Sequence, residues 1–123
     1  MSKGYLFEDL TNKIIKCFYN VYDELGNGFL ESVYEKSLMI ELKDMGLKAV
    51  NQQSLDVFYK KHLVGDFKAD IIVEDKIVIE IKAVTKLTPH HEAQLINYLK
   101  ATGIKLGLLV NFGEELEFKR RIF

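Results

Sequence analysis

The sequence predicts an α/β protein, a three-layer-like sandwich in which helices flank a mixed central β-sheet. Three observations predict this class: amphipathic helical patterns open the chain, alternating strand patterns fill its middle, and a helical pattern then lies between two apolar strand runs. The chain has 123 residues, of which 48% are hydrophobic and 28% charged. This length and composition are ordinary for one globular domain, which we expect to span residues 1–123 in the order α-α-β-β-β-α-β.

Two helices are predicted first. Apolar residues recur at three- and four-residue steps from Leu10 to Leu25, and the glycines at positions 26 and 28 end that pattern. A second helix is predicted over residues 30–45, with Gly46 as a natural C-cap. Its inner side should carry Leu30, Tyr34, Leu38, Leu42 and Met45. Cys17 falls in the first helix, where a buried inert thiol is expected, and a single cysteine excludes a disulfide framework and a cysteine-based zinc site.

Three strands follow. Leu55, Val57 and Tyr59 alternate as the first, and a turn at residues 60–62 leads into the second. The second and third strands alternate on either side of an acidic turn, residues 74–76. A three-residue turn pairs Val73 with Ile77 and places all the following apolar residues on one face. These are Phe67, Ala69, Ile71, Val73, Ile77, Ile79 and Ile81.

The last part of the chain predicts a helix between two strands. Thr88 is a suitable N-cap and Pro89 suits the first helical position, while Gly103 marks the end. Residues 105–110 form a short apolar run typical of a buried strand, and residues 117–123 are either an edge strand or a docked tail. The strand–helix–strand segment should form a right-handed crossover with a parallel strand pair.

The register of the second and third strands places Asp70 directly opposite Glu80. At roughly 5 Å between Cβ atoms, two like charges destabilise a strand pair. A cation between them would relieve this repulsion, and carboxylate oxygens are ligands that Mg²⁺ takes. Lys82 follows on the same face and would point into the same site. The alternative is a solvated sheet face on which these side chains form salt bridges.

Further polar residues could join this face. Glu31 lies in the first turn of the second helix, where it could stabilise the helix dipole or supply a third acidic group. Gln94 and Tyr98 lie one turn apart in the third helix, in line with His90. Tyr98 could equally be a core residue with its hydroxyl group at the rim. The adjacent histidines 90 and 91 diverge on a helix and make poor ligands for one zinc ion.

Charge and hydropathy limit the partners. The formal net charge is −1, so no overall positive field attracts nucleic acid, and binding would need local patches at residues 60–62 or 119–121. The start of the chain lacks the apolar run of a signal peptide. No segment approaches the ~18 apolar residues of a membrane span. We therefore expect a cytoplasmic protein without a membrane partner.

Three motifs carry a resemblance to a known family. Asp70 followed by Glu80-Ile81-Lys82 resembles the signature of the PD-(D/E)XK nuclease superfamily, although Ala69 stands where a proline often precedes the Asp. The pair Gln94 and Tyr98 resembles the Q-x-x-x-Y motif of its RecB-like branch. Residues 28–34 are similar to the motif of the GxxExxY proteins, a small bacterial branch. The resemblance covers residues 28–110.

This resemblance implies a restriction-endonuclease-like core and a phosphodiesterase that acts on DNA or RNA with Mg²⁺ or Mn²⁺. Asp70, Glu80 and the Ile81 carbonyl group would hold the metal ion. Lys82 would orient the attacking water or help to deprotonate it.

The same resemblance implies roles for three further residues. Glu31 would steady the metal ion through a water or assist a second ion, while Gln94 and Tyr98 would position the substrate or lock Lys82 and Glu80. Two other functions stay open: a catalytically silent nucleic-acid-binding or scaffold protein on the same fold, and a dimeric junction-specific endonuclease. The sequence shows no element that reads a target, so a protein partner for targeting also stays open.

Overall fold

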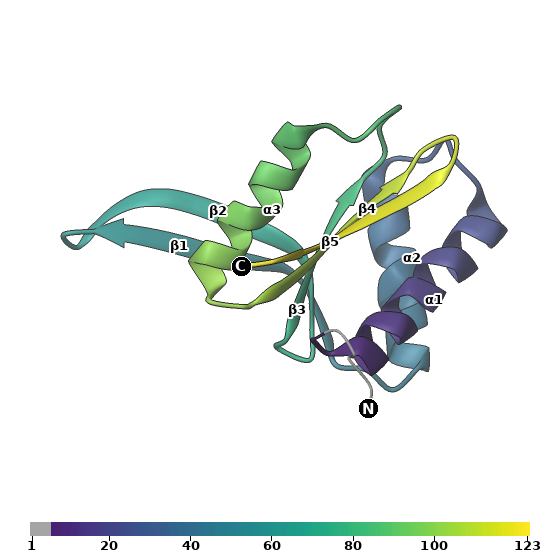
Figure 1. The fold of residues 1–123 in the computed structure, drawn as a ribbon, viewed down its shortest axis with the longest axis horizontal. Coiled ribbons are helices and arrows are strands. Elements are labelled where there is room, and N and C mark those ends of the chain that lie inside the picture. Colours follow the sequence, from purple (N-terminus) through teal and green to yellow (C-terminus); the bar gives the residue numbers. More distant parts are fainter. Residues whose placement is uncertain (1–5) are drawn as a thin grey trace.

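The computed structural model describes residues 6–123. The first five residues of the predicted domain, on which part of the signal-peptide argument depends, lie outside the described residues. Within residues 6–123, three helices and five strands follow one another, and Figure 1 shows their arrangement. They are α1 (Glu8–Leu25), α2 (Glu31–Asp44), β1 (Ala49–Tyr59), β2 (His62–Val73), β3 (Ile77–Lys82), α3 (Pro89–Thr102), β4 (Leu106–Phe112) and β5 (Leu116–Ile122).

The five strands form one mixed sheet in the order β1-β2-β3-β4-β5. Neighbouring strands are antiparallel except β3 and β4, which run parallel on either side of the α3 connection. The mixed sheet and its parallel pair are therefore confirmed. β5 pairs with β4 along its whole length, so the last residues form an edge strand and not a docked tail.

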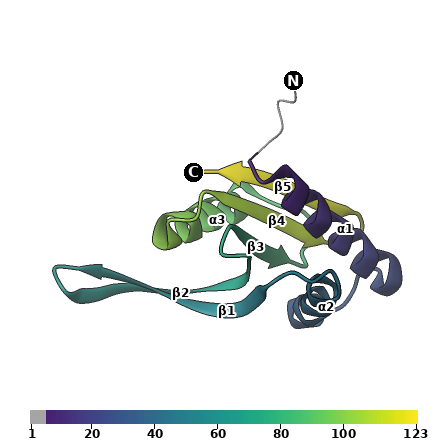
Figure 2. The ribbon, with the colours of Figure 1, turned by 90° about the horizontal axis from the view of Figure 1, so that it is seen from below.

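Helices cover both faces of the sheet, which confirms the layered arrangement (Figures 1 and 2). The apolar side chains of α1 and α2 pack with one face of β2, β3 and β4 in a large core cluster. A second cluster joins α3 to the opposite face. It contains Ala69, Ile72, Val78, Leu87, Leu95, Leu99 and Leu109. Within residues 6–123, no helix has the length and apolar character that crossing a bilayer demands.

The helix boundaries follow from local signals that the sequence displays. Gly26, with φ 66°, ends α1, and Gly103, with φ 76°, ends α3. Thr88 caps α3 ahead of Pro89, and the Thr88 N–H donates to His91 Nδ1 at 3.0 Å in a capping box. His91 is therefore engaged in holding the start of its own helix.

Cys17 is fully buried between α1 and α2, as predicted. Its Sγ lies 3.7 Å from Met45 Sδ. Burial, assisted by the nearby Glu41 carboxylate, raises the pKa of the thiol to about 11.

Two details of the predicted elements are wrong. Leu30 is 78% exposed because it is the N-cap of α2, with φ −70° and ψ 156°, so its side chain does not follow the buried stripe. His62 is not part of the turn: it pairs with Tyr59 as the first residue of β2. The turn consists of Lys60 and Lys61, with φ 48° and 66°, which is the two-residue geometry that matches strand twist.

The single apolar face predicted for β2 is also wrong for its first half. Ile71 packs in the core with α1 and α2, whereas Ala69 packs in the cluster with α3. The Phe67 ring likewise lies edge-on to Tyr98 of α3, with ring centres 5.9 Å apart. The alternation of β2 side chains is therefore reversed at Asp70, so that Ala69 and Phe67 face α3 while Ile71 faces α1 and α2. Gln52, which stands opposite on β1, has φ 53°, and this irregular backbone accounts for the reversal.

Beyond this point β1 and β2 continue as a two-stranded arm that projects away from the sheet, which Figures 1 and 2 show clearly. Their pairing runs from Ala49↔Val73 to Tyr59↔His62 and shifts once, next to Val57. At the other end of β2, residues 74–76 form the predicted three-residue turn, because Val73 pairs with Ile77.

Candidate metal centre

The candidate site lies where β2 and β3 separate. Their ladder ends at the pair Ile71↔Ile79, one position before Asp70 and Glu80 would face each other. In place of a backbone partner, Asp70 Oδ2 accepts a hydrogen bond from the Ile81 N–H at 2.7 Å. The Asp70 carboxylate is therefore held against the edge of β3, beside the next side chain on that strand, Glu80.

Glu80 is a buried carboxyl group, only 3% exposed, and its Oε1 has no hydrogen-bond partner among the described residues. Desolvation, followed by the neighbouring Asp70 carboxyl group, raises the pKa of Glu80 far above its usual range, while Lys82 acts in the opposite direction. Across residues 6–123, none of the ion pairs involves Asp70, Glu80 or Lys82. The alternative of a solvated, salt-bridged face is therefore wrong at Glu80.

Helix α3 supplies the other wall of the site. Lys82 Nζ donates to Gln94 Oε1 at 3.0 Å, so a neutral amide fixes the direction of the ammonium group. Tyr98 lies one turn further along the same helix face. Burial and the Glu80 carboxyl group raise the pKa of the Tyr98 hydroxyl well above its usual range, so this group stays protonated. The structure thus brings Asp70, Glu80, Lys82, Gln94 and Tyr98 together.

The donor set fits a divalent cation. Two adjacent carboxyl groups, one of them with an unpartnered buried oxygen, present hard oxygen ligands at a place where unbalanced negative charge is costly. The part of the chain that the structure describes holds no cluster of three or more acidic, histidine or cysteine side chains suited to a metal ion. Water and substrate oxygens would therefore complete the coordination, as they commonly do for Mg²⁺. The Ile81 carbonyl group stays a predicted ligand.

Glu31 is the predicted site residue that the described contacts do not join to the others. It is exposed at the start of α2, and in the described part of the chain no hydrogen bond or ion pair joins it to Asp70 or Glu80. Glu35, one turn later, is linked instead: Gln52 Nε2 donates to Glu35 Oε1 at 2.7 Å and to Asp70 Oδ1 at 3.4 Å. Neither Glu35 nor Gln52 is among the site residues predicted from the sequence. The four-residue spacing from Glu31 was a signal that could have found Glu35.

Residues 28–34 shape the loop between α1 and α2 and the start of α2. Gly28 adopts φ 107°, which a residue with a side chain rarely adopts. The Tyr34 hydroxyl donates to the Gly26 carbonyl at 2.6 Å and accepts from the Phe29 N–H at 3.3 Å. Its ring stacks on Phe112, with centres 4.3 Å apart. Tyr34 thereby holds the loop between α1 and α2 against the end of β4.

Comparisons with known proteins bear on the family and the fold. The chain matches the PD-(D/E)XK nuclease superfamily over residues 8–122. A comparison with curated proteins found no match. Among solved structures, the chain is similar to a protein designated SSO0001, with 22% identity and a TM-score of 0.62. The alignment covers 74% of this chain and 48% of that protein, so the chain spans about half of its length.

Two nucleases are also among the similar structures. One is an alkaline exonuclease from Laribacter hongkongensis, with 13% identity and a TM-score of 0.56, covering 99% of this chain and 72% of that one. The other is Hjc, a Holliday junction resolvase from Archaeoglobus fulgidus, with 18% identity and a TM-score of 0.45, covering 72% of each chain.

The predicted restriction-endonuclease-like fold is confirmed. Nucleases of this superfamily typically use divalent metal ions. The family match extends from the first turn of α1 to the end of β5 and includes every residue of the candidate site. The chain therefore belongs to the PD-(D/E)XK nuclease superfamily.

Proposed function

We propose that this chain is a metal-dependent nuclease that hydrolyses phosphodiester bonds in DNA or RNA, with Mg²⁺ as its ion and Mn²⁺ as a substitute. The observation that carries the proposal is the buried Glu80 carboxyl group, which has an unpartnered oxygen and lies beside Asp70. A divalent cation bound there would polarise the phosphoryl group and lower the pKa of a bound water. Family membership and the fold agree with this activity.

Each surrounding residue has a distinct task in the proposed reaction. Asp70, oriented by the Ile81 N–H, and Glu80 hold the cation. Lys82 directs its ammonium group toward the attacking water or a phosphoryl oxygen, because Gln94 occupies one of its three donor hydrogens and leaves two. The protonated Tyr98 hydroxyl neighbours Glu80 and keeps that carboxyl group in place.

Cleavage of labelled single-stranded, duplex and branched oligonucleotides tests the proposal. We expect Asp70→Ala and Lys82→Ala each to lower the Mg²⁺-dependent rate by about 10²-fold or more, and EDTA to abolish cleavage. Asp44→Ala is the matched control, because Asp44 is an exposed carboxylate at the end of α2 and should leave the rate unchanged. If Asp70→Ala cleaves as well as wild type, the proposal fails.

Calorimetric titration with Mn²⁺ separates an enzyme from a silent scaffold on this fold. The proposed centre binds Mn²⁺, and Asp70→Ala removes that binding. A protein that binds neither Mg²⁺ nor Mn²⁺ at this site is a scaffold. A protein that binds the ion without cutting any substrate is a catalytically silent relative.

We also infer that the chain falls in the GxxExxY branch of the superfamily. The support is the physical role of its Gly28 and Tyr34, which together shape and hold the loop that precedes Glu31. This leaves Glu31 exposed and free for the predicted contribution to the metal centre through a water. A junction-specific dimer, a targeting partner and a cytoplasmic location stay predictions.

A further inference from the structure

The β1–β2 arm carries an exposed surface that the proposed chemistry does not use. In Figure 2 the tip of the arm lies apart from the helices. Large apolar side chains there are more than half exposed: Phe58 by 60%, Tyr59 by 63%, Leu63 by 56% and Val64 by 61%. A two-stranded hairpin has little stability of its own, so several large apolar side chains left exposed at its tip call for an explanation.

The turn at the tip is built from residues that do not favour its geometry. Lys60 and Lys61 both adopt positive φ angles, 48° and 66°, in a two-residue turn for which Asn-Gly is the preferred sequence. The chain instead places two positive charges there, next to His62. Lys60 Nζ lies 5.5 Å from the centre of the Tyr59 ring. The tip therefore combines cations with aromatic faces.

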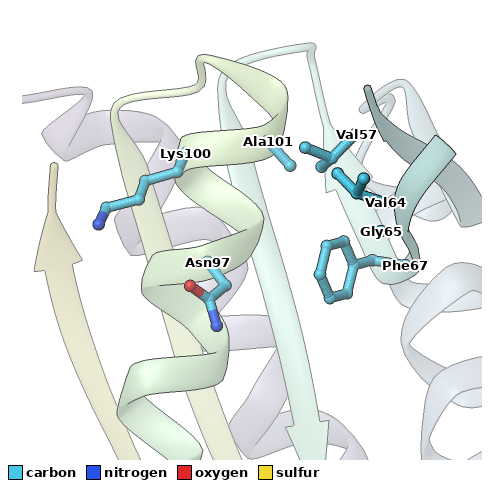
Figure 3. A pocket seen from close by; sticks show the side chains of 7 residues that line it. All are labelled: Val57, Val64, Gly65, Phe67, Asn97, Lys100 and Ala101. Atoms are coloured by element: carbon cyan, nitrogen blue, oxygen red, sulfur yellow. The ribbon is translucent and has the colours of Figure 1, made fainter. Parts of the chain in front are cut away.

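A groove lies between the arm and α3, and Figure 3 shows the side chains that line it. It is a cavity of about 320 Å³, with Val57, Val64 and Phe67 on one side and Asn97 on the other. Lys100 points away from the arm in Figure 3, with its ammonium group 5.6 Å from the Phe123 ring. Because Phe67 contacts Tyr98, which neighbours Glu80, the groove adjoins the candidate site.

The two faces of the arm differ in acidic residues, and a polyanion would approach the face without Asp56 and Asp66. Strand alternation places Asp56 and Asp66, which pair with each other, on the face opposite to Val57 and Phe67. Those two carboxylates would repel phosphate groups. The face with Val57 and Phe67, which we call the underside of the arm, does not carry these two carboxylates. It ends at the two lysines of the turn.

We propose that the arm and the groove bind an unpaired, single-stranded segment of polynucleotide and lead it to Asp70 and Glu80. This inference rests on the proposed nuclease function and specifies its substrate. Unpaired bases can stack on the exposed ring of Tyr59, which alternation places on the same face as Val57, whereas a duplex keeps its bases stacked on one another. The lysines of the turn match the phosphate charges, and the Asn97 amide offers a donor and an acceptor to a base edge.

The test measures binding without cleavage, by fluorescence anisotropy of labelled oligodeoxythymidylate and oligouridylate in EDTA, with a duplex of equal length for comparison. The key variant is Lys60→Asn with Lys61→Gly, which suits the turn and should maintain or raise the melting temperature. We expect its affinity for the single strands to fall. The slope of log K against log salt concentration should fall by about 1.4, that is about 0.7 for each lost phosphate contact.

Two further variants sharpen the test. Tyr59→Ala should weaken single-strand binding by about tenfold through loss of stacking. Lys36→Asn with Lys43→Asn removes the same charge from the exposed side of α2 and should change neither affinity nor slope. The two labelled probes decide between DNA and RNA, which share this chemistry.

Each other result has one meaning. The inference is overturned if the variant with Lys60→Asn and Lys61→Gly binds as wild type does, if wild type prefers the duplex, or if wild type binds no single strand. It is also overturned if light scattering shows that the variant changes the number of subunits while binding is unchanged, because the arm then joins two copies. Single-strand binding that depends on the arm, without cleavage in Mg²⁺ or Mn²⁺, supports the inference and refutes the proposed function. If the protein cleaves in Mg²⁺ or Mn²⁺ at the same rate with and without the arm substitutions, the proposed function is supported and the inference about the arm is refuted.

Discussion

At the scale of single residues, the buried Glu80 carboxyl group lowers the folding stability of the metal-free protein as the pH rises. Its folded-state pKa is raised by burial and by Asp70, so the native state retains a proton that the unfolded chain releases as the pH rises above its ordinary value. The native state is then progressively less favoured across the range from about pH 4.5 upward. Each pH unit in this window costs up to about 1.4 kcal/mol.

We therefore expect Glu80→Gln to flatten the pH dependence of stability in EDTA. The glutamine needs no proton, so the stability of the variant relative to wild type should rise steadily from about pH 5 to pH 8, by up to about 4 kcal/mol in total. Urea unfolding at several pH values measures this difference. Glu114→Gln, at an exposed position, is the control and should keep the wild-type slope. A Glu80→Gln variant with that same slope would contradict the account of Glu80.

At the scale of elements, the site depends on how closely α3 packs on β4. A methyl group at Gly107 would lie 2.7 Å from Leu95 Cδ1, and Leu95 is fully buried. Gly107→Ala should therefore displace α3 and cost about 1–3 kcal/mol of folding free energy, measured by urea unfolding. The displacement moves Gln94 and Tyr98, so cleavage should fall. Mn²⁺ affinity should persist, because the two carboxylates belong to β2 and β3.

A second substitution tests whether steric crowding is the cause. Leu95→Val shortens the side chain that the new methyl group meets, so the double variant should recover part of the lost stability and activity. If the two destabilisations simply add, the effect of Gly107→Ala has another origin. Calorimetry with Mn²⁺ on both variants shows whether the metal centre is intact.

The elements themselves were largely readable from the sequence. Helical periodicity, the Thr88 cap and the glycines at positions 26 and 103 placed the helices, and the turn at residues 74–76 set the register that brings Asp70 beside Glu80. These features are local, so neighbouring residues in the sequence determine them.

What the sequence could not supply depends on contacts between distant segments. The reversal of side-chain alternation at Asp70 follows from the backbone of Gln52 on another strand, which no strand pattern reveals. The link from Glu35 through Gln52 has the same origin. The burial of Glu80 could not be predicted either, because alternation assigns a face but does not say that α3 covers it.

At the scale of the whole molecule, metal binding should be visible as stability. An ion that binds the native state alone stabilises it by about 2.7 kcal/mol at a hundredfold excess over its Kd. We expect Mn²⁺ to raise the melting temperature of wild type and of the Asp44→Ala control, and to leave that of Asp70→Ala unchanged. Differential scanning fluorimetry measures this. An equal rise in Asp70→Ala would place the ion elsewhere. A single domain over residues 1–123 and a homodimer stay predictions, the latter testable by light scattering.

The position of the arm has a consequence for how such a chain can vary over time. The turn at residues 74–76 sets the register of β2 against β3, and it lies at the opposite end of β2 from the tip. Residues can therefore be gained or lost at Lys60 and Lys61 without slipping Asp70 out of line with Glu80. The length and the residues of the arm can therefore change at its tip while Asp70 and Glu80 keep their relative positions.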